Sequence, residues 1–115
     1  DELAASGFNV VHAAPENIEL AHRSGLMTWT TVGAVDLAKL EETGAAIGAA
    51  VDRVKGLPGL LMIETTDEPA WTWMKAEARV APEPLIATYG IIKERAPGKL
   101  VYMNQGPTNL VETLR

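Results

Sequence analysis

The chain has 115 residues, and its 47% hydrophobic and 22% charged residues are typical of a globular protein rather than a disordered one. Its 10 basic and 15 acidic residues give a net charge of −5, which argues against nucleic acid or an anionic membrane as a partner. It contains no cysteine, which excludes disulfides, cysteine zinc sites and thiol nucleophiles. Its apolar stretches are far shorter than the roughly 20 residues that span a bilayer.

The first half of the chain alternates strand and helix patterns. Residues 1–7 resemble the last turns of a helix that ends at Gly7, and because the chain begins with Asp1 rather than Met we expect a longer protein. A strand is predicted at 8–13, a helix that Pro15 opens and Gly25 closes, and a second strand at 26–32. Apolar residues then recur every three or four positions across 36–55, which predicts an amphipathic helix.

The second half continues the alternation. A Gly- and Pro-rich break at 56–59 precedes an almost continuous apolar run at 60–63, which is typical of a parallel strand covered on both faces. A helix is predicted at 84–95, a strand at 99–104 and the start of a further helix at 109–115. Turn-forming residues lie between every pair of elements.

This alternation indicates an α/β fold of parallel βα units with right-handed crossovers. An open doubly wound sheet and a (β/α)8 TIM barrel both fit the pattern. No Gly-x-Gly-x-x-Gly or Walker loop follows a predicted strand, and this favours the barrel over a nucleotide-binding sheet. Because a full barrel takes about 250 residues, residues 1–115 are expected to form one partial barrel domain, about half of the whole.

The residues that follow the predicted strands are polar, and active sites of parallel α/β folds lie at this end of the strands. They are His12, Thr30, Thr31, the run 64–69, Asn104 and Gln105. Two carboxylates can perform acid/base catalysis when their surroundings separate their pKa values, which draws attention to Asp67 and Glu68. The alternative interpretation is that Asp67 caps the following segment and Glu68 is solvated.

Trp71 and Trp73 follow these carboxylates, where their rings either stack on sugars or pack against a neighbouring loop. Glu64 has the strand parity of Met62 and is expected to face the barrel interior, either in an ion pair with a strand outside this chain or as a supporting group. His12 has either a ligand-binding or a structural role. The histidine spacing predicts no metal site, and no cofactor is expected.

Four segments together resemble TIM-barrel glycoside hydrolases of the clan that includes cellulases and β-mannanases. They are Gly7-Phe8-Asn9-Val10-Val11-His12, Gly25-Leu26-Met27, 54–60 and Asp67-Glu68-Pro69, and they correspond to the second to fifth strands over almost the whole chain. The clan's fourth strand ends in Asn-Glu-Pro, whose Glu is the general acid/base. The resemblance implies that Glu68 protonates the leaving-group oxygen and later activates water. His12 stands where the clan usually has Arg, and Asp67 replaces the usual Asn.

The sequence therefore predicts a glycoside hydrolase fragment that cleaves a poly- or oligosaccharide, with Glu68 as its catalytic residue. The residues expected to bind substrate are Asp67, Trp71, Trp73, His12, Asn104 and Gln105. The clan's nucleophile, on the seventh strand, would lie beyond Arg115, so the remaining half of the barrel or a second copy of the chain is an expected partner. The alternative is a non-catalytic carbohydrate-binding or self-associating half-barrel. The resemblance favours a secreted or periplasmic location.

Overall fold

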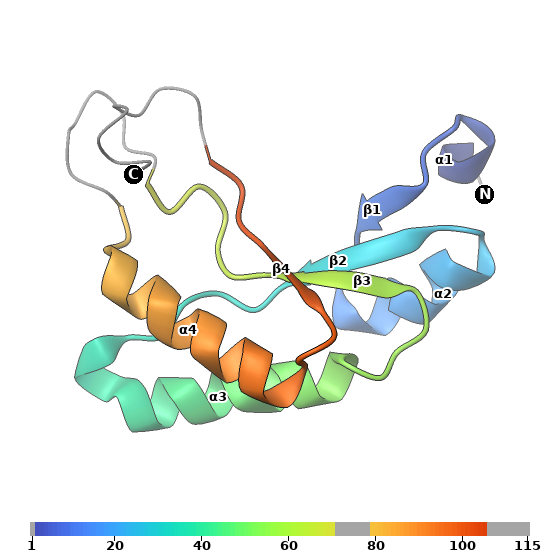
Figure 1. The fold of residues 1–115 in the computed structure, drawn as a ribbon. Helices are drawn as coiled ribbons and strands as arrows, with labels where there is room; N and C mark the ends of the chain where they lie inside the picture. The colour runs from blue at the N-terminus through green and yellow to red at the C-terminus, as the bar shows by residue number, and fades with distance from the viewer. Residues whose placement is uncertain (1, 71–78, 106–115) are drawn as a thin grey trace.

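A computed structural model describes residues 2–70 and 79–105, and its strands alternate with helices (Figure 1). The elements in chain order are α1 (Glu2–Ala5), β1 (Val10–His12), the 3₁₀ helix η1 (Pro15–Asn17), α2 (Ile18–Arg23), β2 (Met27–Thr31), the 3₁₀ helix η2 (Leu37–Lys39), α3 (Leu40–Val54), β3 (Leu60–Glu64), α4 (Pro82–Arg95) and β4 (Leu100–Tyr102). In the described part of the chain the strands form one sheet in the order β1-β2-β3-β4, and each neighbouring pair is parallel. The predicted α/β class with parallel βα units is confirmed.

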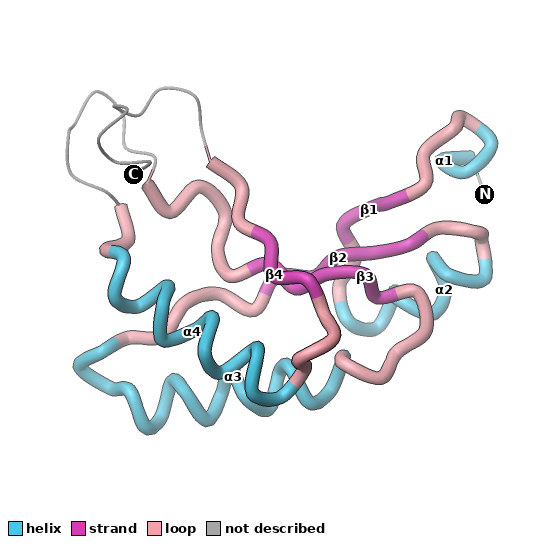
Figure 2. The backbone as a smooth tube through the Cα atoms, viewed as in Figure 1, coloured by secondary structure: helices cyan, strands magenta, loops and turns pink. Residues whose placement is uncertain are grey.

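The hydrophobic core lies between the sheet and the helices on one of its faces. The helices α3 and α4 pack side by side below the sheet in the view of Figures 1 and 2. Val51 of α3, Ile63 of β3 and Ile92 of α4 are fully buried where these layers meet. Burial of such side chains contributes roughly 1.5–3 kcal/mol each, which holds the helices on this face.

The strand β2 shows which side chains face the helices and which face away. Thr28 and Thr30 are buried on the helix side, whereas Met27 and Thr31 are exposed and Trp29 is half-buried on the opposite side. The Thr28 hydroxyl donates to the Gly59 carbonyl at 3.3 Å, which satisfies its buried polar atom. The helix-covered face of β2 therefore carries Thr28 and Thr30, and Met27, Trp29 and Thr31 lie on the other face.

The register extends this division to β3. Thr30 is paired with Ile63 and Thr31 with Glu64, so Glu64 lies on the face opposite the helices, as its parity with Met62 predicts. Figure 2 shows this face of the sheet turned away from α3 and α4. The carboxyl ends of the strands therefore present polar side chains on a face that α3 and α4 leave open.

Several helix boundaries differ from those predicted. The helix expected from residue 36 begins with η2, because the Asp36 side chain accepts from the Ala38 N–H at 2.9 Å and holds a tighter first turn. The helix expected from Pro15 likewise begins with η1. In contrast, α4 starts at Pro82, two residues earlier than predicted, since proline fits the first helical turn where no N–H bond is lost. The predicted helix at 109–115 lies outside the described residues.

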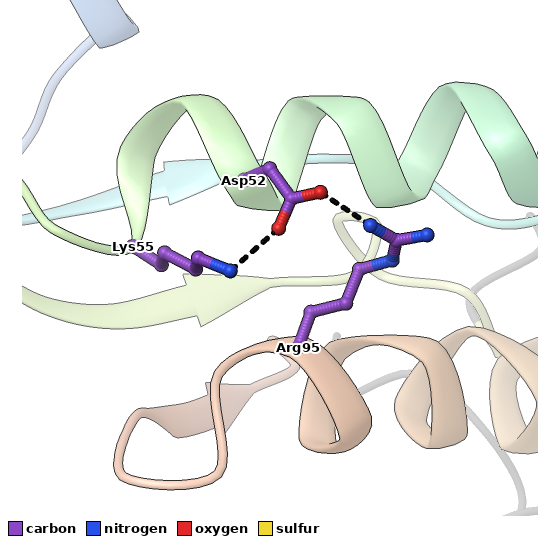
Figure 3. Close-up of polar contacts among 3 residues, drawn as sticks. All are labelled: Asp52, Lys55 and Arg95. Carbon is purple, nitrogen blue, oxygen red and sulfur yellow. Dashed lines mark hydrogen bonds and ion pairs between the residues drawn. The ribbon is translucent and has the colours of Figure 1, made fainter.

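An ion-pair cluster links α3 to α4 (Figure 3). One carboxylate oxygen of Asp52 accepts from the Lys55 ammonium at 2.7 Å, and the other contacts the Arg95 guanidinium from α4. Arg95 passes over Gly48, where an added Cβ would come within 2.6 Å of its Nε. The hydrogen bond from Lys55, aided by the positive charge of Arg95, lowers the pKa of the Asp52 carboxyl below its usual value.

Candidate functional site

A cleft of about 310 Å³ opens at the carboxyl ends of the strands, on the face opposite α3 and α4. We call it the strand-end cleft, and it is lined by His12, Trp29, Thr31, Glu64, Asp67, Tyr102 and Asn104. Each of the four strands contributes at least one of these side chains, and the loops after β3 and β4 supply Asp67 and Asn104. In parallel α/β sheets this edge is where ligands bind.

A hydrogen-bonded chain crosses the floor of the cleft from β1 to β3. The Nε2 atom of His12 lies 3.2 Å from the Thr31 hydroxyl, and that hydroxyl donates to Oε2 of Glu64 at 2.6 Å. Each residue is the last of its strand, so the parallel register brings the three together. Glu64 is 5% exposed, and it forms no ion pair with any described residue.

Aromatic rings form one wall of the cleft. The Trp29 ring lies 5.6 Å from the His12 ring and 6.3 Å from the Tyr102 ring, measured between centroids. The Trp29 and Tyr102 planes meet at 72°, an edge-to-face arrangement that aromatic pairs favour. The wall spans β1, β2 and β4, and it places an apolar surface beside the polar floor.

The loop after β3 is tied to the segment after β4 by three hydrogen bonds. The Asn104 amide donates to Oδ1 of Asp67 at 2.9 Å, and the Glu68 N–H donates to the Asn104 carbonyl at 3.1 Å. The Ala70 N–H donates to the Gln105 side-chain oxygen at 3.3 Å. Asn104 and Gln105 therefore position the Asp-Glu-Pro loop, and Asp67 has a side-chain partner at the rim of the cleft.

Glu68 has a left-handed backbone conformation, with φ of 44°. Such a conformation costs a residue other than glycine roughly 1–3 kcal/mol and persists only where its surroundings enforce it. Here the N–H is held by Asn104, the carbonyl accepts from Nε of Arg79 at 3.3 Å, and the following Pro69 is fully buried. Strain of this kind concentrates at functional sites.

The structure brings together some of the predicted site residues. His12, Asp67 and Asn104 line the strand-end cleft, whereas Gln105 supports the loop through its side chain. Glu68 adjoins Asp67 but is not among the residues that line the cleft. The predicted Trp71 and Trp73 lie outside the described residues.

Sequence reasoning missed Trp29 and Tyr102 as site residues and treated Thr31 only as a strand-end position. Trp29 is two residues before Thr31 in β2 and therefore shares its face, so strand parity was a usable signal. Glu64 was expected either in an ion pair or in a supporting role. Its partner in the described part of the chain is the Thr31 hydroxyl.

Two other features, a metal-binding cluster and a membrane-spanning helix, are absent from residues 2–70 and 79–105. No group of three or more histidine or carboxylate side chains there could hold a metal ion. None of the helices in these ranges is long and apolar enough to cross a membrane. The strand-end cleft is therefore the site from which we infer function.

Comparisons with protein-family models, with curated proteins and with solved structures give no match to this chain. Similarity thus assigns it to no family.

Proposed function

We propose that this chain supplies the acid/base part of the active site of a glycoside hydrolase barrel, with Glu68 as the group that protonates the leaving-group oxygen. The observation that carries the proposal is the strand-end cleft, in which two carboxylates, Glu64 and Asp67, lie beside aromatic rings next to the Asp-Glu-Pro loop. The strained backbone of Glu68, held on both sides, supports a functional role for this residue.

The lining of the cleft is complementary to a sugar. A pyranose ring has apolar C–H faces, which pack on aromatic rings, and hydroxyl edges, which need donors and acceptors. Trp29 and Tyr102 offer the aromatic surface, and Asp67 and Asn104 offer an acceptor and an amide. Asn104 already donates to Asp67, so the two side chains present a fixed polar edge to the ligand.

The chemistry assigned to Glu68 has two steps. As an acid, Glu68 transfers its proton to the glycosidic oxygen as the bond to the anomeric carbon breaks, and it becomes a carboxylate. As a base, it takes a proton from the water that attacks the anomeric carbon and returns to its acid form. Between these steps a second carboxylate, about 5–5.5 Å from Glu68, forms a bond to the anomeric carbon as the leaving group departs, and that bond breaks when water attacks; we expect the remaining half of the barrel to supply this carboxylate.

The order of the strands supports a barrel. In a doubly wound sheet the strand order reverses and helices cover both faces. Here the order is β1-β2-β3-β4, and α3 and α4 lie on the same face. A further βα unit added to β4 in the same way would extend the sheet towards closure, with the strand-end cleft on its inner side.

A second candidate function, a self-associating half-barrel, is favoured by the apolar surface at the β4 edge. Ile86 and Tyr89 of α4 are 68% and 51% exposed, and Leu100 of β4 is 60% exposed. In addition, β1 and β4 have no second neighbour among the described strands. Light scattering of the purified full-length protein distinguishes the candidates, since a half-barrel that closes with its copy is a dimer and a complete barrel has no need of one.

The catalytic proposal is tested by comparing Glu68→Gln with wild type in the full-length protein. The substrates are cello-, manno- and xylo-oligosaccharides and nitrophenyl glycosides. Loss of a general acid lowers kcat/KM, which reports the steps up to departure of the leaving group, by about 10²–10⁴-fold on the oligosaccharides and by less on nitrophenyl glycosides, whose leaving group needs little protonation. Glu83→Gln, the same change in the exposed first turn of α4, is the matched control. Equal losses on both substrate types would remove Glu68 from the acid role.

A further inference from the structure

The hydrogen-bonded chain on the cleft floor has a defined direction. A threonine hydroxyl carries one proton, and that of Thr31 is donated to Oε2 of Glu64. The Thr31 oxygen must therefore accept from His12, so Nε2 of His12 carries a proton. His12 and Thr31 together orient the Glu64 carboxyl from the side of β1 and β2.

Within residues 2–70 and 79–105, the other oxygen of Glu64 has no partner. Among the described residues no hydrogen bond reaches Oε1, and no cation pairs with this carboxyl, although the residue is only 5% exposed. Thr65 Oγ1 is the fully buried side-chain atom without a partner among the described residues, so Oε1 of Glu64 keeps some accessible surface and can accept a hydrogen bond from water or a ligand. Because Glu64 lines the strand-end cleft, a bound ligand can reach it.

The surroundings of Glu64 indicate the chemical class of that ligand. The cleft is lined by the Trp29 and Tyr102 rings and by the Asp67–Asn104 pair, and none of the described residues that line it is a lysine or an arginine. An anionic ligand is disfavoured beside two carboxyl groups. A neutral polyol supplies hydroxyl donors for Oε1 and C–H faces for the rings.

We propose that Glu64 binds substrate directly, with Oε1 accepting a sugar hydroxyl, and that His12 and Thr31 are positioning residues that hold Glu64 for this contact. The assignment rests on the proposed function, because it names the carboxyl that orients the sugar at the same site. The two proposals are tested by different measurements: the role of Glu64 by an equilibrium binding affinity, and the catalytic role of Glu68 by a rate.

The test measures binding of cello- and manno-oligosaccharides by calorimetry to the full-length protein carrying Glu68→Gln, which keeps the probe intact. Adding Glu64→Gln weakens binding roughly tenfold to a hundredfold, since Gln has a single, uncharged acceptor oxygen, which Thr31 engages, and its amide nitrogen cannot accept from the sugar. Adding Thr31→Val weakens it roughly two- to tenfold, and Thr31→Ser, which keeps the hydroxyl, restores the affinity. Glu42→Gln, on the exposed surface of α3, is the charge-matched control.

Thermal unfolding of each variant separates this role from a structural one. Glu64→Gln with unchanged affinity and a lower unfolding temperature would overturn the assignment, because Glu64 would then be a structural group, paired with a cation from another part of the protein. Unchanged affinity with unchanged stability would overturn it too. If the protein bound none of the sugars, the proposed function itself would fail. Binding that is insensitive to Glu64 and Thr31 would refute only the present inference.

Discussion

The hydroxyl of Thr88 joins α4 to the loop that follows β2, and its removal gives a stability change that can be worked out from the structure. The side chain is fully buried. Its oxygen accepts from the Val35 N–H at 3.0 Å and its hydrogen is donated to the Pro84 carbonyl at 2.8 Å. Thr88→Val keeps the β-branched shape, so it opens no cavity. The two residues also have nearly the same helix propensity, so the helix contributes almost the same free energy of unfolding in both proteins.

The cost of Thr88→Val is therefore the loss of the hydrogen bonds. Val35 is 4% exposed, so its N–H is left buried without an acceptor, which costs about 1–3 kcal/mol. Thr88→Ser keeps the hydroxyl and removes one methyl, which costs about 1 kcal/mol. Urea unfolding of the protein, followed by tryptophan fluorescence, measures both, with unchanged m-values as the check on two-state behaviour. A Thr88→Val variant as stable as wild type would refute the bridging role of the hydroxyl.

Three further stability predictions use the same unfolding assay. Thr65→Val stabilises the protein by about 1 kcal/mol, because the buried Thr65 hydroxyl has no hydrogen-bond partner among the described residues; a loss of stability would mean that the hydroxyl is satisfied. Gly59→Ala destabilises the protein by at least about 1–2 kcal/mol, because Gly59 has a φ of +85° and the new Cβ would lie 2.6 Å from Cβ of His22. Gly98→Ala is the control and leaves stability unchanged, because the space around Gly98 is open. Asp52→Asn destabilises at neutral pH. The pKa of Asp52 is lower in the folded protein than its unfolded value near 3.8, so the ionised carboxylate contributes its full stabilisation above that value. This stabilisation is lost as pH falls through the folded-state pKa, and the stabilities of wild type and variant therefore converge in acid. A stability difference that does not change with pH would contradict this role of Asp52.

The long helix and the buried strand were predictable because their patterns extend over many residues. The apolar spacing of 36–55 corresponds to α3, and the apolar run at 60–63 corresponds to β3. The helix start differed because one side chain, that of Asp36, tightens the first turn. Such local capping is decided by one or two hydrogen bonds, and a periodicity averaged over many residues does not register it.

The aromatic wall was harder to predict, because β2 reverses the usual pattern. Its helix-covered face carries Thr28 and Thr30, while Met27 and Trp29 face the open side. Hydropathy alone places the larger apolar side chains in the core, so it assigns the wrong face. The hydroxyl of Thr28 is tolerated there because it donates to the Gly59 carbonyl, a contact 31 residues away in sequence.

The position of Glu68 was predictable from the Asp-Glu-Pro motif, but its conformation was not. Its left-handed backbone is held by Asn104 and Arg79, which come from later segments of the chain. Likewise, the chain from His12 to Glu64 depends on the register of three strands. Contacts of this range follow from the assembled sheet and have no signature in any short window of sequence.

The central claim is that the strand-end cleft binds a sugar with its scissile bond at Glu68. The most direct test is a crystal structure of the full-length Glu68→Gln protein with a bound oligosaccharide from the panel above. We expect a sugar ring against Trp29 or Tyr102, with the glycosidic oxygen about 2.6–3.2 Å from the side chain of residue 68. An oligosaccharide bound away from this cleft, or one whose glycosidic oxygen lies beyond the reach of residue 68, would contradict it.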